Sequence, residues 1–168
     1  MKKHPLIIIA GLLVFSTASV AVEQASAKQA NAAQQLIPYS LAQTVQTFSK
    51  TVHGGVQHVV VKSADNARDI KLIQTHLAKL AVDFSKGDFS VTEKLHGADM
   101  PGLARLKMAK TDDIRFDYKA LANGGQIHYA SEYPQYIQAL HEWFEAQAAE
   151  HGATVAPGHA QHHMAPAE

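Results

Sequence analysis

The sequence contains no cysteine in its 168 residues. This absence excludes a thiol nucleophile, a thiolate zinc site and covalent c-type haem, which is attached through Cys-x-x-Cys-His. It also excludes a bacterial lipoprotein anchor, because that anchor is built on a cysteine after the signal sequence. If the protein is exported, its stability must come from the packed core without disulfide bonds.

An excess of positive charge is also absent, since 15 Lys and Arg residues balance 15 Asp and Glu residues. Without residues 1–21, which carry two lysines and no acid, 13 basic and 15 acidic residues remain, a charge near −2. This balance gives no reason to expect nucleic acid or anionic lipid as a partner. The longest apolar run, Leu6 to Phe15, is too short for a comfortable membrane span. We therefore expect no integral membrane span in the mature protein.

The first 21 residues have the pattern of a secretory signal peptide. Lys2 and Lys3 precede the apolar run, and small residues follow it up to Ala21, where we expect cleavage. Cleavage after Ala27 is the alternative. Removing residues 1–21 leaves 147 residues (168 − 21 = 147), which suits one domain. The expected location is the periplasm, or outside the cell.

The rest of the chain divides by composition into an arm, a domain and a tail. Residues 22–39 are polar and alanine-rich, which predicts a flexible N-terminal arm. Residues 153–168 are rich in His, Pro and Ala, which predicts a disordered tail. Residues 40–152 carry the apolar periodicity and are predicted to form a single α+β domain.

Strands and helices alternate within this domain. A run of β-branched residues predicts a central buried strand, and an Asn-Gly turn between alternating segments predicts a β-hairpin. The expected elements are helix from Ser40, strand 51–62, helix 65–86, loop 87–102, short helix 103–110, hairpin 114–130 and helix 134–151. This order predicts an α+β fold in which a small, mostly antiparallel sheet, made of the central strand and the hairpin, is covered by helices on one face.

Ten of the eleven histidines follow the signal peptide, and histidine is the commonest metal ligand in proteins. Imidazole suits zinc or copper, and a thioether adds a preference for copper. We expect Asp99 to orient one imidazole by accepting its second N–H. No compact motif such as His-Glu-x-x-His is present, so the fold would have to bring the ligands together. The candidate ligands, from strand, loop and last helix, are His53, His58, His96, Met100 and His141.

Each candidate also has a structural alternative. His53 beside two glycines would cap a turn, and His58 would be a core histidine bonded to a backbone carbonyl. His96 would stabilise the start of a helix, and His141 would pack beneath Trp143. The metal hypothesis requires His96 to approach at least one of the other three histidines. In the tail, a second and looser metal collector is predicted from His159, His162 and His163.

Three functions follow from these observations. The first is an exported protein that binds a transition metal, copper or zinc. The second is a non-metal ligand-binding or protein-interaction module with structural histidines, and the third is a small hydrolase or lyase with a His–Asp pair. No Gly-x-Ser-x-Gly, Ser-x-x-Lys or phosphate-binding glycine loop is present, so the sequence does not favour an enzyme.

Three sequence blocks resemble a family of short exported bacterial proteins that automatic labelling calls aspartate carbamoyltransferase. The blocks begin at His53, His96 and Leu140, and read His-Gly-Gly-Val-Gln-His-Val-Val-Val-Lys, His-Gly-Ala-Asp-Met-Pro-Gly-Leu and Leu-His-Glu-Trp-Phe. The label does not fit this chain, which is about half as long as that enzyme's catalytic chain and lacks its Ser-Thr-Arg-Thr phosphate loop. Export would also remove the protein from carbamoyl phosphate. The resemblance covers most of residues 40–152 and implies no particular ligand.

Overall fold

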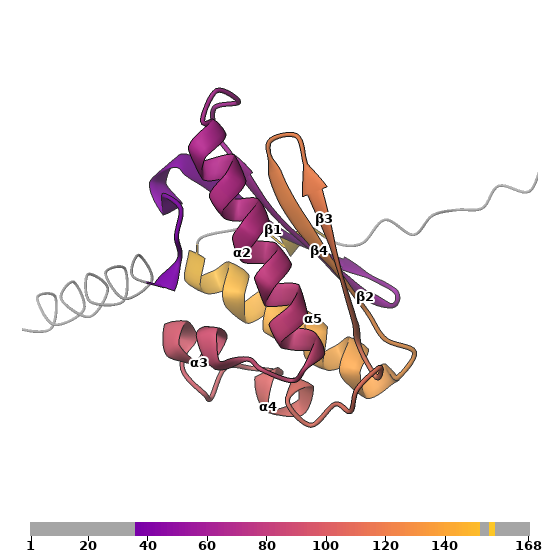
Figure 1. The fold of residues 1–168 in the computed structure, drawn as a ribbon. Helices are drawn as coiled ribbons and strands as arrows, with labels where there is room; N and C mark the ends of the chain where they lie inside the picture. Colours follow the sequence, from indigo (N-terminus) through magenta and orange to yellow (C-terminus); the bar gives the residue numbers. More distant parts are fainter. Residues whose placement is uncertain (1–35, 152–154, 157–168) are drawn as a thin grey trace, which may run out of the picture.

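The computed structural model describes residues 36–151 and 155–156, which form a sheet with helices packed on it (Figure 1). The predicted α+β fold class is confirmed. No helix in the described part of the chain is long and apolar enough to cross a membrane. The signal peptide predicted over residues 1–21 lies outside the described residues, as do the tail histidines His159, His162 and His163.

The first half of the sheet is a hairpin of β1 (Thr44–Thr51) and β2 (Gly54–Val61), paired antiparallel. The helix predicted ahead of the central strand is wrong, because only a short 3-10 turn, η1 (Leu41–Gln43), precedes β1. Leu41, Val45 and Phe48 match a helical period, but β1 buries Phe48 and leaves Val45 42% exposed. Pairing with β2 along the whole of β1 overrides this weak local periodicity.

The second half of the sheet is the predicted hairpin, formed by β3 (Arg115–Leu121) and β4 (Gly124–Ala130). β4 also pairs antiparallel with β2, which places the strands in the order β3-β4-β2-β1. A two-residue strand, β5 (Val155–Ala156), pairs parallel with β1 at the opposite edge. These two residues were predicted to lie in a disordered tail, so the sheet extends beyond the expected end of the domain at residue 152.

Two long helices cover one face of the sheet, as predicted (Figure 1). α2 (Ala67–Ser85) packs on β3 and β4, and its Asn66 cap accepts a hydrogen bond from the backbone N–H of Asp69. α5 (Pro134–His151) packs on β1 and β2. α2 therefore covers mainly the β3–β4 half of the sheet, and α5 covers the β1–β2 half.

The segment between α2 and β3 contains α3 (Ser90–His96) and α4 (Leu103–Leu106). The sequence predicted α4 but placed α3 in a loop, because turn-forming residues surround it. Asp88 accepts a hydrogen bond from the backbone N–H of Ser90 at the start of α3, and apolar side chains of α3 pack on the core. The short helix thus gains stability from tertiary packing that its own sequence does not supply.

An aromatic cluster forms the centre of the core. Trp143 of α5 is 1% exposed at the centre of this cluster. Ile37 and Tyr39 are also buried, so the end of the predicted flexible arm over residues 22–39 belongs to the core. The rings in mutual contact are Phe84, Phe89, Phe116, Tyr129, Trp143 and Phe144.

Candidate functional site

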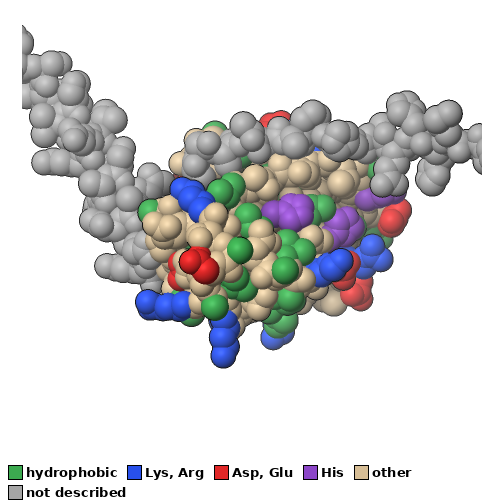
Figure 2. Space-filling view, turned by 90° about the horizontal axis from the view of Figure 1, so that it is seen from above, with side chains coloured by type: hydrophobic (Ala, Val, Ile, Leu, Met, Phe, Trp, Pro, Cys, Tyr) green, Lys and Arg blue, Asp and Glu red, His purple; other side chains and the backbone are tan. Residues whose placement is uncertain are grey.

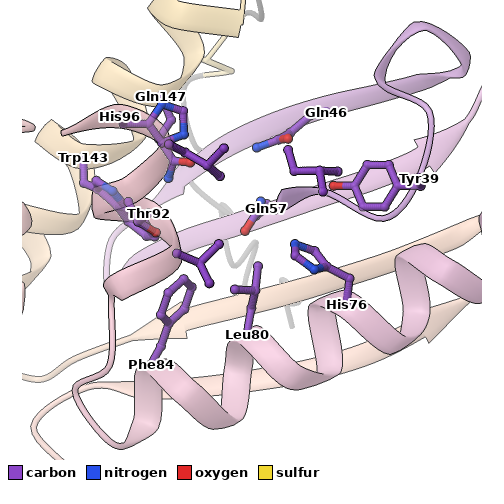
Figure 3. Close-up of a pocket in the computed structure, with 13 residues that line it drawn as sticks. Tyr39, Gln46, Gln57, His76, Leu80, Phe84, Thr92, His96, Trp143 and Gln147 are labelled. Atoms are coloured by element: carbon purple, nitrogen blue, oxygen red, sulfur yellow. The ribbon is translucent and has the colours of Figure 1, made fainter. Parts of the chain in front are cut away.

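A cavity lies between the covered face of the sheet, α2, α3 and α5 (Figure 3). It holds about 440 Å³ of space not filled by atoms, part of it open to solvent, and about 40 Å³ can hold the centre of a water molecule. Its wall is partly apolar, from Ile37, Leu80, Phe84, Val91, Leu95 and Trp143. The polar side chains that line it are Tyr39, Gln46, Gln57, His76, Thr92, His96 and Gln147.

Two side chains of α5 that line this cavity carry buried donors without a partner. Trp143 Nε1 and Gln147 Nε2 are buried and have no hydrogen-bond partner among the described residues. The two residues are four positions apart on a helix, so they lie on the same face one turn from each other. A buried donor without a partner costs about 1–3 kcal/mol, so two of them beside one cavity need an explanation.

On the sheet side, Gln57 of β2 reaches the same cavity. Its Oε1 accepts a hydrogen bond from the hydroxyl of Tyr129 at 2.6 Å. Tyr129 is fully buried, and this burial raises the pKa of its hydroxyl, so the hydroxyl is a donor. The bond fixes the orientation of the Gln57 amide, because the oxygen end faces Tyr129.

On the α2 side, His76 lines the cavity opposite α5 (Figure 3). Its ring meets that of Tyr39 edge-on, with the centroids 5.7 Å apart. Burial lowers the pKa of His76, and the positive charge of Lys79 lowers it further, so the ring is held neutral. Burial likewise raises the pKa of Tyr39. Both groups therefore enter the cavity wall without charge at neutral pH.

His96 lies at the end of α3, and its Nδ1 contacts a carboxylate oxygen of Glu150 on α5. The His96 side chain is 6% exposed, whereas that of Glu150 is 34% exposed. The pair therefore fastens α3 to α5 at one edge of the cavity. The sequence places His96 in a loop and predicts Asp99 as the acceptor for one of the imidazoles. In the structure His96 ends a helix, Asp99 is exposed, and Glu150 is the carboxylate that contacts the His96 ring.

His141 is held by the backbone of the β1–β2 turn. Its Nε2 lies 3.0 Å from the carbonyl oxygen of Thr51 and 2.9 Å from that of Gly54. Both partners are acceptors, so Nε2 carries the proton and donates to them. This nitrogen is therefore occupied in fastening α5 to the turn, a structural role that the sequence had not identified.

The remaining predicted ligands are spread over the molecule. His53 is exposed in the β1–β2 turn, and Met100 is 5% exposed within the core. His58 lies on the uncovered face of the sheet with Val56 and Val60, so it is not a core histidine. Histidine side chains reach the surface beside hydrophobic ones on the side shown in Figure 2.

Among the residues that the structure describes, no three His, Asp or Glu side chains come together in a group suited to hold a metal ion. The predicted collector in the tail lies outside those residues. The copper or zinc hypothesis therefore stays a prediction.

The cavity-lining residues Trp143, Gln147 and His76 are not among the site residues predicted from the sequence. One signal was present: Gln147 lies one turn after Trp143, next to the apolar stripe that contains Phe144 and Ala148. A glutamine that helical periodicity places at the edge of a core is a candidate for a polar contact inside it.

No family model, curated protein or solved structure matches this chain. The resemblance to short exported proteins therefore stays a prediction, and function has to be inferred from the geometry of the cavity.

Proposed function

We propose that the protein is an exported binding module for a small molecule, which occupies the cavity between the sheet and helices α2, α3 and α5. The observation that carries this proposal is the cavity itself, in which the polar side chains of Gln57 and His76 lie beside an apolar wall that includes Leu80 and Phe84. A formed pocket that combines apolar surface with convergent polar groups is typical of small-molecule sites.

Water alone is the competing occupant. A water molecule needs about 10–15 Å³ of such space, so the 40 Å³ open to water centres holds about three waters. Waters in this space would lie against the apolar wall of Leu80, Phe84 and Val91. A ligand with an apolar body and an acceptor atom satisfies both parts of the wall, and it releases the waters.

Trp143 is the only tryptophan, so its fluorescence reports on the cavity directly. We expect a library of small molecules to contain compounds that change this emission saturably and raise the melting temperature of the full chain. Val91→Phe, which fills the cavity, should abolish both effects. Val60→Phe is the matched control, because Val60 lies on the uncovered face of the sheet. Equal binding by both variants would contradict the proposal.

The transition-metal alternative predicts a different result. Chains with and without residues 157–168 would be titrated with Cu²⁺ and Zn²⁺, keeping Val155–Ala156 because they pair with β1. Saturable binding of one ion by the shorter chain, lost in His53→Ala or His58→Ala, would favour the metal function. Binding lost with residues 157–168 would assign it to the tail histidines.

A further inference from the structure

One edge of the sheet, the outer side of β3, is open within the described part of the chain. In the strand order β3-β4-β2-β1-β5, β3 pairs only with β4, whereas β1 at the other side is partly covered by β5. β3 contains no proline and pairs with β4 without a bulge from Arg115 to Leu121. Proteins usually block such an edge with proline, a bulge or a covering segment, because its unpaired N–H and C=O groups can bind another strand.

The side chains of β3 carry charges of alternating sign. Arg115 and Asp117 have side chains that are 67% and 64% exposed, and Lys119 is exposed two residues further on. These three residues lie on the same face of the strand, because side chains in a strand alternate between the two faces. A strand with charges of one sign would repel its own copy, whereas this positive–negative–positive order suits an antiparallel copy in a particular register.

The matching register pairs β3 with β3 of a second copy about Tyr118, the middle residue of the strand. Asp117 then faces Lys119 of the other copy, and this pair of opposite charges occurs twice. All residues of β3 take part in the pairing. Moving the centre by one residue, to Asp117 or to Lys119, places two like charges directly opposite each other, which is destabilising. The charges therefore favour pairing about Tyr118 over both adjacent registers.

The same pairing brings the two copies of α2 together. α2 runs along β3 and β4 on the covered face of the sheet (Figure 1). Neighbouring strands are about 4.8 Å apart, so a helix centred over β3 and β4 lies about 5 Å from the two-fold axis between the paired β3 strands. The axes of the two α2 helices would then be about 10 Å apart, which is within reach of the usual packing distance of about 8–10 Å.

The side of α2 that would meet its copy carries an exposed apolar residue. Gln74 identifies this side, because its Nε2 donates to the carbonyl oxygen of Leu121 in β3 at 2.9 Å. Ala78 and Val82 follow Gln74 at intervals of four residues, which keeps them on that side of the helix. Val82 is 50% exposed. Contact between the two helices would cover it and add apolar area to the backbone pairing.

We propose that the protein forms a two-fold dimer in which the β3 strands of two copies pair antiparallel about Tyr118 and the two α2 helices pack side by side. The residues that line the cavity belong to other strands and to the opposite side of α2, so this interface does not rest on the proposed function. Because both copies use the same edge, the assembly closes at two copies and does not grow into a fibre.

Charge reversal tests the pairing on the full chain, with the monomer–dimer equilibrium measured by analytical ultracentrifugation. Asp117→Lys gives both facing positions a positive charge, and Lys119→Asp gives both a negative charge. Each variant alone should raise the dissociation constant of the dimer at least about tenfold. A mixture of the two variant chains restores both attractive pairs and should dimerise like the wild type. Asp99→Lys, the same charge change in the loop between α3 and α4, is the control and should leave the equilibrium unchanged.

A single introduced cysteine tests the register, because the natural chain has none. Residues that face each other in antiparallel strands have Cα atoms about 4.5–5.5 Å apart, a distance that suits a disulfide. Tyr118→Cys, on the two-fold axis, should therefore give a covalent dimer in oxidised glutathione. Ala120→Cys is the control, because its two copies would lie about 13 Å apart or more along the strands and should not be linked.

Three results would overturn the proposal. The first is a wild type that stays monomeric at about 0.1 mM, which would show that β3 does not bind a second copy. The second is a dimer that neither charge reversal weakens, or a mixture of the two variants that fails to dimerise although each keeps the wild-type circular dichroism spectrum. The third is equal cross-linking of Tyr118→Cys and Ala120→Cys, which needs neither charge variant to fold.

Discussion

Helix α5 carries two polar regions that differ in how their hydrogen bonds are satisfied. Near its middle, His141 donates to two backbone carbonyls, those of Thr51 and Gly54. Towards its C-terminal end, Trp143 and Gln147 present donors that have no partner in the described structure. The first region makes its histidine hydrogen bonds within the protein, although the Thr51 hydroxyl beside them is buried without a partner among the described residues. The two donors of the second region have no such partner.

On this one helix, His141 is a partly buried donor that is satisfied by the protein, whereas Trp143 and Gln147 carry buried donors that are not. A satisfied buried donor holds two elements in a fixed relation, and losing it costs stability. An unsatisfied donor lowers the stability of the empty protein and is retained where a partner from outside completes it. Removing the His141 donor should therefore destabilise the fold, and removing an unpaired buried donor from the second region should stabilise it.

The largest effect is expected at Gly54, whose carbonyl oxygen accepts from His141. Its φ of +145° lies outside the range of ordinary side-chain-bearing residues, and an added Cβ would lie 2.3 Å from the carbonyl oxygen of Tyr129. Gly54→Ala should lower the free energy of unfolding by about 3 kcal/mol or more in urea titrations. Gly87→Ala is the control, because its φ is also positive but nothing lies near its Cβ; it should cost about 1 kcal/mol.

Removing the His141 side chain should have the next largest effect. His141→Ala leaves the carbonyls of Thr51 and Gly54 without their donor, so we expect a loss of about 1.5 kcal/mol in unfolding free energy. His128→Ala on the uncovered sheet face is the matched control and should change stability by less than about 0.5 kcal/mol. Equal losses of unfolding free energy in the two variants would show that the two hydrogen bonds of His141 do not stabilise the fold.

At the cavity, the sign should reverse. Gln147→Leu removes an unpaired buried donor, so the ligand-free protein should gain about 1 kcal/mol in unfolding free energy. Gln138→Leu, on the exposed face of α5, should stay within about 0.5 kcal/mol of the wild type. Destabilisation by Gln147→Leu would mean that the amide already has a partner in solution.

The smallest effect is a pH dependence from His76 in the cavity wall. Its folded pKa is lowered, chiefly by burial, so the unfolded chain binds more protons in the window just below its ordinary value of about 6.5. The free energy of unfolding should therefore fall as the pH drops from about 7 through this window, because unfolding is accompanied by the uptake of up to one proton. His76→Gln should flatten that part of the profile, measured as unfolding free energy against pH; an unchanged slope would contradict the assignment.

Much of the architecture could be predicted from sequence because it rests on local signals. The Asn-Gly turn and the alternation of Ile127 and Tyr129 predicted the second hairpin, and the apolar stripe of α2 with its Asn66 cap predicted that helix. The β1 segment was predicted as a helix because its few apolar residues fit both a helical and a strand period. Pairing with β2 decides in favour of the strand. Long-range partners of this kind leave little trace in the segment itself.

The candidate site was harder to predict, for a related reason. Histidines are conspicuous in a sequence, and the metal hypothesis rests on four of them, His53, His58, His96 and His141. An unpaired donor is a property of three-dimensional packing, and nothing local to Trp143 or Gln147 says whether an acceptor lies opposite. The sequence could predict which residues face the core but not which of them lack a partner there.

Titration of the full chain with small molecules, followed by the fluorescence of Trp143 in the cavity wall, tests the central claim most directly. The account predicts compounds that change the emission saturably in the wild type and in Val60→Phe but not in Val91→Phe, which fills the cavity. Equal binding by the wild type and Val91→Phe would contradict the account.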